Sequence, residues 1–278
     1  MPEPAAPTTP LPPPSPLVLI GRLAFAAAVA FWGFQHFQHA AFVTRAMPPW
    51  PDGFPFREVA AYTVGALFIL AALALLLRRQ ARRAAVLVAV VVFLGFAFLA
   101  LPNAFNDVRL GGAWTHAGKA FWIASGALLV ASTFPVDPQS PTDRLFVLLG
   151  RIALGAFMIQ SGLQHFLWAD FVHTLVPAWM PGGPFWTYFT GVALVAGGLG
   201  LFIPRTARLA ALASGAMVAA WVLMVHIPRA FFTVRDTNEA TALFEAIAFS
   251  GLAFLLSAKT PPARVSPQST ASLPPPVS

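Results

Sequence analysis

The residues best suited to chemistry are two histidines, His36 and His165, each preceded by a glutamine inside a long apolar stretch. An imidazole can exchange hydrogen bonds with a ligand or bind a metal ion. An ionisable group in an apolar segment of membrane-spanning length is a functional hypothesis by default. Two interpretations stay open: the imidazoles bind a ligand headgroup such as a quinone carbonyl, or the Gln-His pairs pack against neighbouring helices.

The two histidines lie in a sequence repeat. The tripeptide Gln-His-Phe around His36 recurs around His165 at an offset of 129 (165 − 36), and the same offset relates two Gly-Arg pairs. Further along, the offset is 126, as one loop deletion would produce. The matching pairs include Gly21-Arg22 with Gly150-Arg151, Gly65 with Gly191, and Pro102 with Pro228. The sequence therefore predicts a tandem duplication.

A second pair of ionisable residues, Lys119 and Glu245, is related by the offset of 126. Both lie about two turns inside the fourth apolar segment of their repeat, roughly 10 Å from its outer end. Lysine can extend its ammonium group to the membrane surface, whereas the glutamate stem is too short. We therefore expect Glu245 to pair with Lys119, Arg229, Arg235 or a histidine. A structural ion pair and a proton relay are equally compatible with this pattern.

Four further residues are candidates for ligand binding. Trp50 and Trp179 lie in Pro-rich loops, where a tryptophan either anchors the chain at the membrane interface or stacks on a ligand. His226 and Asn103 lie next to prolines that end the third apolar segments. We expect both to face the same outer vestibule as the two repeated histidines, although Asn103 could serve only as a helix cap.

Metal and thiol chemistry are disfavoured. His36 and His39 share a helical face, but Trp168 stands where the second repeat would need its own His39. The chain has no cysteine, which excludes disulfides, thiolate catalysis and iron–sulfur ligation. We predict no metal site, and any redox chemistry must use a bound cofactor, a quinone or a partner protein.

The composition is that of a polytopic membrane protein. Apolar residues form 58% of the chain and charged residues only 10%, where soluble domains carry about a quarter. The net charge of +7 comes from basic residues at helix ends and in short loops. Such residues act as topology signals beside anionic lipid, so the lipid bilayer is the expected partner and nucleic acid is not.

The apolar runs predict an all-α protein with eight transmembrane helices, each of about twenty residues. They cover residues 17–42, 58–77, 84–101, 113–133, 145–168, 185–203, 206–226 and 238–257. Two parallel-repeat four-helix bundles follow, over residues 17–133 and 145–257, with a cytoplasmic linker at 134–144. The Pro-rich ends, 1–16 and 258–278, are expected to be disordered tails.

The distribution of Lys and Arg sets the expected orientation. The cluster from Arg78 to Arg83 and most other basic residues fall on the side that holds both termini. The positive-inside rule then places both termini in the cytoplasm and the chain in the inner (plasma) membrane. All histidines and most acids fall on the opposite, extracytoplasmic side, which concentrates the titratable groups at one face.

These motifs resemble those of the DoxX-like membrane proteins, a family of four-helix proteins. The resemblance rests on Gly150-Arg151, Gln164-His165-Phe166, Val176-Pro177-Ala178-Trp179 and Gly191-Val192-Ala193-Leu194. The first repeat departs from it with Met47 and Pro49. The family includes the membrane subunit of archaeal thiosulfate:quinone oxidoreductase, so the resemblance implies a fused pair of units with a quinone- or redox-linked role.

The leading hypothesis is a redox-associated membrane protein whose outer vestibule binds a lipophilic ligand such as quinone. In this hypothesis the chain is the membrane subunit of an oxidoreductase, and catalysis belongs to a partner subunit. The first alternative is a non-catalytic scaffold that anchors a partner protein, and the second is a small-molecule transporter. The sequence leaves open the substrate, the electron donor, the partner and homo-oligomer formation.

Overall fold

The computed structural model describes residues 13–42, 55–135, 140–233 and 237–261, and within these ranges it contains helices and no strand. The predicted all-α class is therefore confirmed. The long helices are α1 (Pro16–His39), α2 (Arg57–Leu76), α3 (Ala81–Gly95), α5 (Gly112–Ala131), α6 (Pro141–Leu167), α8 (Gly183–Phe202), α9 (Ala207–Trp221) and α10 (Thr237–Lys259). The short helices are α4 (Leu101–Phe105) and α7 (Ala169–His173).

Seven of the helical stretches are long and apolar enough to cross a membrane. They correspond to seven of the eight predicted spans, and the remaining span, 113–133, corresponds to α5. The first half of α5 contains Thr115, His116, Gly118 and Lys119, which lower its hydropathy. Most of the second half of α5 is buried against other helices, so protein and not lipid surrounds it.

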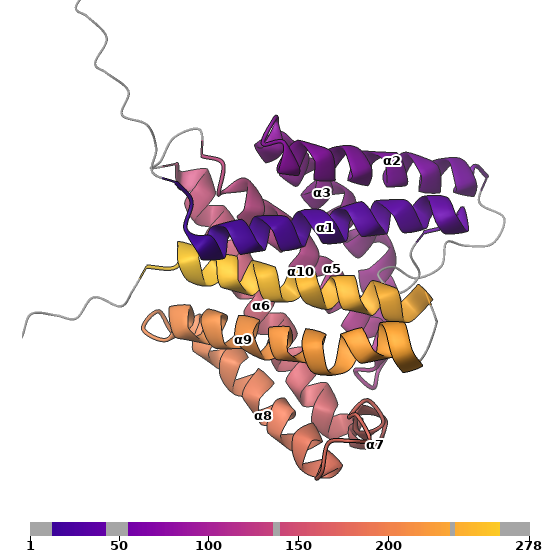
Figure 1. Ribbon diagram of the computed structural model, residues 1–278, viewed down its shortest axis with the longest axis vertical. Coiled ribbons are helices and arrows are strands. Elements are labelled where there is room, and N and C mark those ends of the chain that lie inside the picture. The colour runs from indigo at the N-terminus through magenta and orange to yellow at the C-terminus, as the bar shows by residue number, and fades with distance from the viewer. Residues whose placement is uncertain (1–12, 43–54, 136–139, 234–236, 262–278) are drawn as a thin grey trace, which may run out of the picture.

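The long helices form a closed ring in chain order, in which α10 packs against α1 (Figure 1). This differs from the prediction of two separate four-helix bundles, because α1 packs mainly against α2 and α10 and scarcely touches α5. Correspondingly, α5 packs against α3 and α6. The close crossing of α1 and α10 at Gly21 and Gly251 favours the contact of α1 with α10 over a contact with α5. A Cβ on Gly21 would lie 2.6 Å from the Gly251 carbonyl oxygen.

Both third apolar segments contain a π-helical turn at the same place. Phe96–Ala100 precedes Pro102, and Val222–His226 precedes Pro228, again at an offset of 126. Proline has no N–H to donate and its ring collides with the carbonyl four residues earlier, so the preceding turn widens. The sequence had suggested that the helix ends at each proline. In the structure the helix continues past both prolines.

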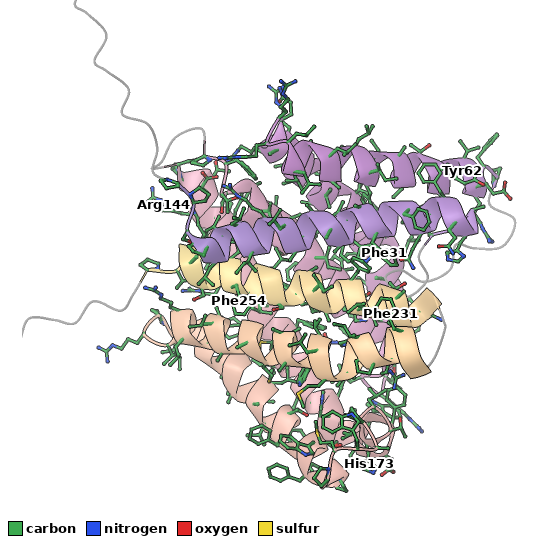
Figure 2. All side chains as sticks on the ribbon, in the orientation of Figure 1. Phe31, Tyr62, Arg144, His173, Phe231 and Phe254 are labelled. Carbon is green, nitrogen blue, oxygen red and sulfur yellow. The ribbon has the colours of Figure 1, made fainter. Side chains whose placement is uncertain are left out.

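Basic residues gather at one end of the ring, where Figure 2 shows Arg144. α1 begins and α10 ends on this side (Figure 1). Here Arg22 donates through Nε to the Thr133 hydroxyl at 2.8 Å, and Arg82 pairs with Asp143 at 2.6 Å. Lys259 donates to the Ser132 carbonyl at 3.3 Å. This end therefore joins the start of α1 to the ends of α5 and α10.

Most predicted helix bounds agree with the structure to within a few residues. The exceptions are the segment predicted to end at 226, which continues past Pro228 to Thr233, and α6, which begins at Pro141, inside the predicted linker 134–144. Proline favours the first helical position, and Asp143 in the first turn complements the helix dipole. Most of both predicted tails, and the loop with Trp50, lie outside the described residues.

Candidate ligand-binding cavity

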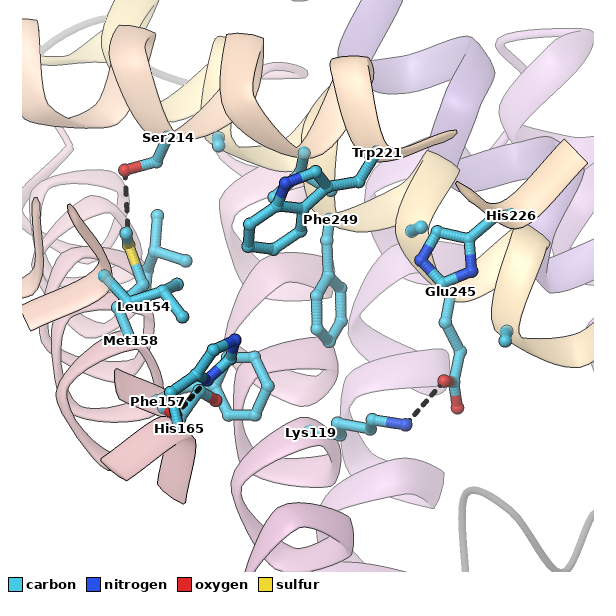
Figure 3. A pocket seen from close by; sticks show the side chains of 16 residues that line it. Lys119, Leu154, Phe157, Met158, His165, Ser214, Trp221, His226, Glu245 and Phe249 are labelled. Carbon is cyan, nitrogen blue, oxygen red and sulfur yellow. Dashed lines mark hydrogen bonds and ion pairs between the residues drawn. The ribbon is translucent and has the colours of Figure 1, made fainter. Parts of the chain in front are cut away.

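A cavity of about 240 Å³ lies between α5, α6, α8, α9 and α10, on the side of the second repeat (Figure 3). Its wall is mainly apolar and aromatic, with the rings of Phe157 and Phe249 packed edge to face at 5.3 Å. A few polar groups interrupt this wall. They come from Lys119, Ser161, His165, Ser214, His226 and Glu245.

The structure brings Lys119 and Glu245 together at the cavity wall. The ammonium nitrogen of Lys119 on α5 lies 2.7 Å from Oε2 of Glu245 on α10 (Figure 3). The two side chains are only 14% and 5% exposed. Each partner of this buried ion pair stabilises the charge of the other, because a buried charge without an opposite charge nearby is unfavourable. The pair also joins the two repeats, since each contributes one partner.

His165 reaches the cavity from α6. Its Nδ1 lies 2.8 Å from the carbonyl oxygen of Ser161, one turn earlier, and its ring faces the cavity (Figure 3). Close packing of α6 on α8 fixes this part of the helix: a Cβ on Gly162 would lie 2.8 Å from the Gly191 carbonyl oxygen. Small residues at the crossing thus position the histidine.

His226 reaches the cavity from the π-helical turn that precedes Pro228. The extra residue in such a turn changes the direction of the side chains that follow, and π turns are frequent at functional sites. Beyond the proline, Arg229 binds Glu239 through two bonds of 2.7 and 3.0 Å, which fastens the end of this segment to α10.

His36, the counterpart of His165, lies in the core and not in the cavity. It is only 2% exposed, and its ring packs against Phe42 and Phe68 at centroid distances of 5.6 and 5.7 Å. Its Nδ1 lies 2.6 Å from the Trp32 carbonyl oxygen. The expectation that both histidines face one vestibule is therefore wrong.

The other predicted ligand-binding residues are not gathered at this cavity. Asn103 is exposed on α4, and Trp179 is 63% exposed. Neither lines the cavity. Trp50 falls outside the described residues. Within the described ranges, His165 and His226 are the predicted ligand-binding residues that share a site with Lys119 and Glu245.

The two glutamines beside the histidines have structural partners in the opposite repeat. Gln35 donates to the Thr241 hydroxyl at 2.7 Å, and the Thr115 hydroxyl donates to Gln164 at 3.0 Å. Thr115 and Thr241 are themselves 126 residues apart, so the two pairs occupy equivalent positions, although glutamine donates in the first bond and accepts in the second. Each repeat thereby holds the fourth helix of the other one, and the Gln-His pairs do take part in helix packing.

Several cavity residues were not anticipated from the sequence, notably Ser161, Ser214 and Trp221. For the two serines a signal was present in the comparison of the repeats, whereas Trp221 matches Gly95 at the offset of 126 and carries no such signal. At the offset of 129 Ser161 matches Trp32, and at the offset of 126 Ser214 matches Val88. Substitution of a large side chain by a small one at a matched position indicates space that only one repeat contains.

An apolar pocket with a few fixed polar groups is typical of a small-molecule site. Its volume is slightly below the range of about 300–1,000 Å³ that is usual for ligand pockets. Within the described residues, no group of three or more His, Cys, Asp or Glu side chains could hold a metal ion. The arrangement is suited to binding an uncharged, largely apolar molecule by a small number of hydrogen bonds.

The fold and this cavity define an all-helical protein of the multi-pass membrane class. Residues 154–256 match a family model described as "Domain of unknown function (DUF8561)". This stretch contains every cavity-lining residue except Lys119. No curated protein and no solved structure matched the chain. The comparisons do not assign the chain to the DoxX-like family, and that resemblance stays a prediction.

Proposed function

We propose that this membrane protein binds a lipophilic molecule with a small polar head, such as a quinone, in the cavity between α5, α6, α9 and α10. The observation that carries the proposal is the mainly apolar, aromatic wall into which Lys119, His165 and His226 place polar groups. The chain would accordingly act as a ligand-binding membrane subunit, and a redox-linked role would require a partner that supplies or removes electrons.

The test is a titration of the detergent-solubilised chain with decylubiquinone, followed by tryptophan fluorescence, since Trp221 lines the cavity. We expect saturable quenching in the wild type. Ser161→Phe should abolish it by filling the cavity, and Ala246→Leu on α10 should act in the same way. The matched control, Leu163→Phe, changes an exposed position on the same helix and should quench like the wild type.

Absence of saturable quenching in the wild type would reject this function and leave the scaffold hypothesis in its place. Quenching that is unchanged in both cavity-filling variants would place the ligand elsewhere.

We also propose that all eight long helices cross the membrane as a tandem repeat with both termini in the cytoplasm. Support comes from the Gln–Thr bonds at equivalent positions and from α1 beginning at the end of the ring where α10 finishes. α5 can be less apolar than the other helices because protein covers much of it. A periplasm-dependent reporter fused after Ser278 should be inactive, and an active fusion would overturn the orientation.

A further inference from the structure

The hydrogen bond inside α6 determines what His165 can offer to a ligand. A carbonyl oxygen only accepts, so the Nδ1 atom that contacts the Ser161 carbonyl carries the proton. In a neutral imidazole the other nitrogen, Nε2, then has no proton and acts as an acceptor. Toward the cavity, a neutral His165 therefore accepts a hydrogen bond and does not donate one. This reverses the role expected from the sequence, in which the imidazole donated to a quinone carbonyl.

His36 in the first repeat has the same arrangement, so its contact with the backbone fixes the same tautomer. Nδ1 of His36 lies 2.6 Å from the Trp32 carbonyl oxygen, also one turn earlier. There the Nε2 atom is buried without a hydrogen-bond partner among the described residues. In the second repeat the equivalent ring borders the cavity, where a ligand can reach it (Figure 3).

A donor for the ligand comes from a different helix. The Lys119 ammonium group has three N–H bonds, and one of them is directed at Glu245 Oε2. The same side chain lines the cavity, so it can also donate to a ligand oxygen. In the view of Figure 3, the Phe249 ring stands between the His165 ring and the ion pair. Acceptor and donor are thus separated by an aromatic surface.

We propose that the cavity selects an apolar ligand that carries a hydroxyl group, whose O–H donates to Nε2 of His165. This inference rests on the proposed ligand-binding function and specifies the chemistry of the head group. A ligand with only carbonyl or ether oxygens presents lone pairs to the lone pair of Nε2 and leaves that nitrogen unsatisfied. For a quinone-class ligand, the reduced, hydroxyl-bearing form is therefore the one that His165 favours.

The test compares 4-nonylphenol with 4-nonylanisole, its methyl ether, by isothermal titration of the solubilised chain. The two probes share the ring and the tail and differ in the O–H donor. A pH of about 8 keeps imidazole with an ordinary pKa neutral. One neutral hydrogen bond corresponds to about fivefold in affinity, so the phenol should bind about five- to tenfold more tightly.

The variant His165→Phe keeps a ring of similar size but removes the acceptor, so both probes should bind it equally. The control is His39→Phe, which changes an exposed histidine at the end of α1 and should keep the preference. A preference that survives in His165→Phe would show that another group recognises the hydroxyl.

The wild-type comparison decides the proposal even if a variant fails to fold. Saturable binding of both probes with equal affinity would overturn the hydroxyl preference and leave the ligand-binding function standing. Absence of saturable binding for both probes, together with decylubiquinone, would overturn both proposals.

Discussion

His36 and His165 make the same contact with the backbone, but the His36 ring is buried in the core and the His165 ring borders a cavity. Three buried side chains of the first repeat are larger than their counterparts in the second repeat, which border the cavity. The corresponding pairs are Trp32 and Ser161, Phe68 and Leu194, and Phe25 and Leu154. Both histidines still bond the carbonyl one turn earlier. These three reductions of side-chain volume accompany the cavity, while both histidines keep the same bond inside their helices.

Similar contacts join the two repeats in both directions, although the described cavity borders only the second repeat's histidine. Gln–Thr bonds at equivalent positions join each first helix to the fourth helix of the other repeat. The Lys119–Glu245 pair is the exception, because matched positions carry opposite charges. Two identical charges at these matched positions would repel each other, whereas Lys119 and Glu245 attract.

The largest expected effect comes from breaking that charge pair. Glu245→Leu leaves the Lys119 ammonium without its carboxylate, which we expect to cost about 3–5 kcal/mol of stability in detergent melts. Glu245→Gln keeps a hydrogen-bond acceptor and should cost less.

The charge-reversed double variant, Lys119→Glu with Glu245→Lys, is the matched control for this experiment. It restores an ion pair between the same two helices and should recover most of the lost stability. A Glu245→Leu protein that melts like the wild type would show that the carboxylate does not stabilise a buried cation.

The two contacts between first and fourth helices offer a second, smaller contrast. A Cβ on Gly21 would lie 2.6 Å from both the Gly251 carbonyl oxygen and Leu255 Cβ. The nearest atom to a Cβ on Gly150 would be Leu129 Cβ at 3.4 Å, an ordinary contact. Gly21→Ala should therefore cost about 1–3 kcal/mol by overpacking, whereas Gly150→Ala should change stability little. Equal melting temperatures for the two variants would contradict this difference.

Hydropathy was sufficient to predict the helical class and the position of nearly every long helix, because twenty apolar residues in a row have few other structures available. Hydropathy could not predict that α10, and not α5, packs against α1, because it does not specify which helices are neighbours. The choice depends on close approach at Gly21 and Gly251, which requires knowledge of the crossing.

The site was only partly predictable for a similar reason. The short stem of Glu245 and its matched position made Lys119 an expected partner, and the structure places them 2.7 Å apart. His36 lies on α1, which does not border the cavity, and its ring packs against Phe42 and Phe68, which the repeat pattern alone does not reveal. A comparison of side-chain size between the repeats indicates space at Ser161 and Ser214, where the first repeat has Trp32 and Val88.

The central claim is that one repeat binds a ligand where the other is filled, and the stoichiometry of binding tests it most directly. Native mass spectrometry of the solubilised chain with decylubiquinone should show one bound molecule per chain. Ser161→Phe should show none, and Leu163→Phe should again show one. Two equivalent bound molecules, or one that persists in Ser161→Phe, would contradict the account.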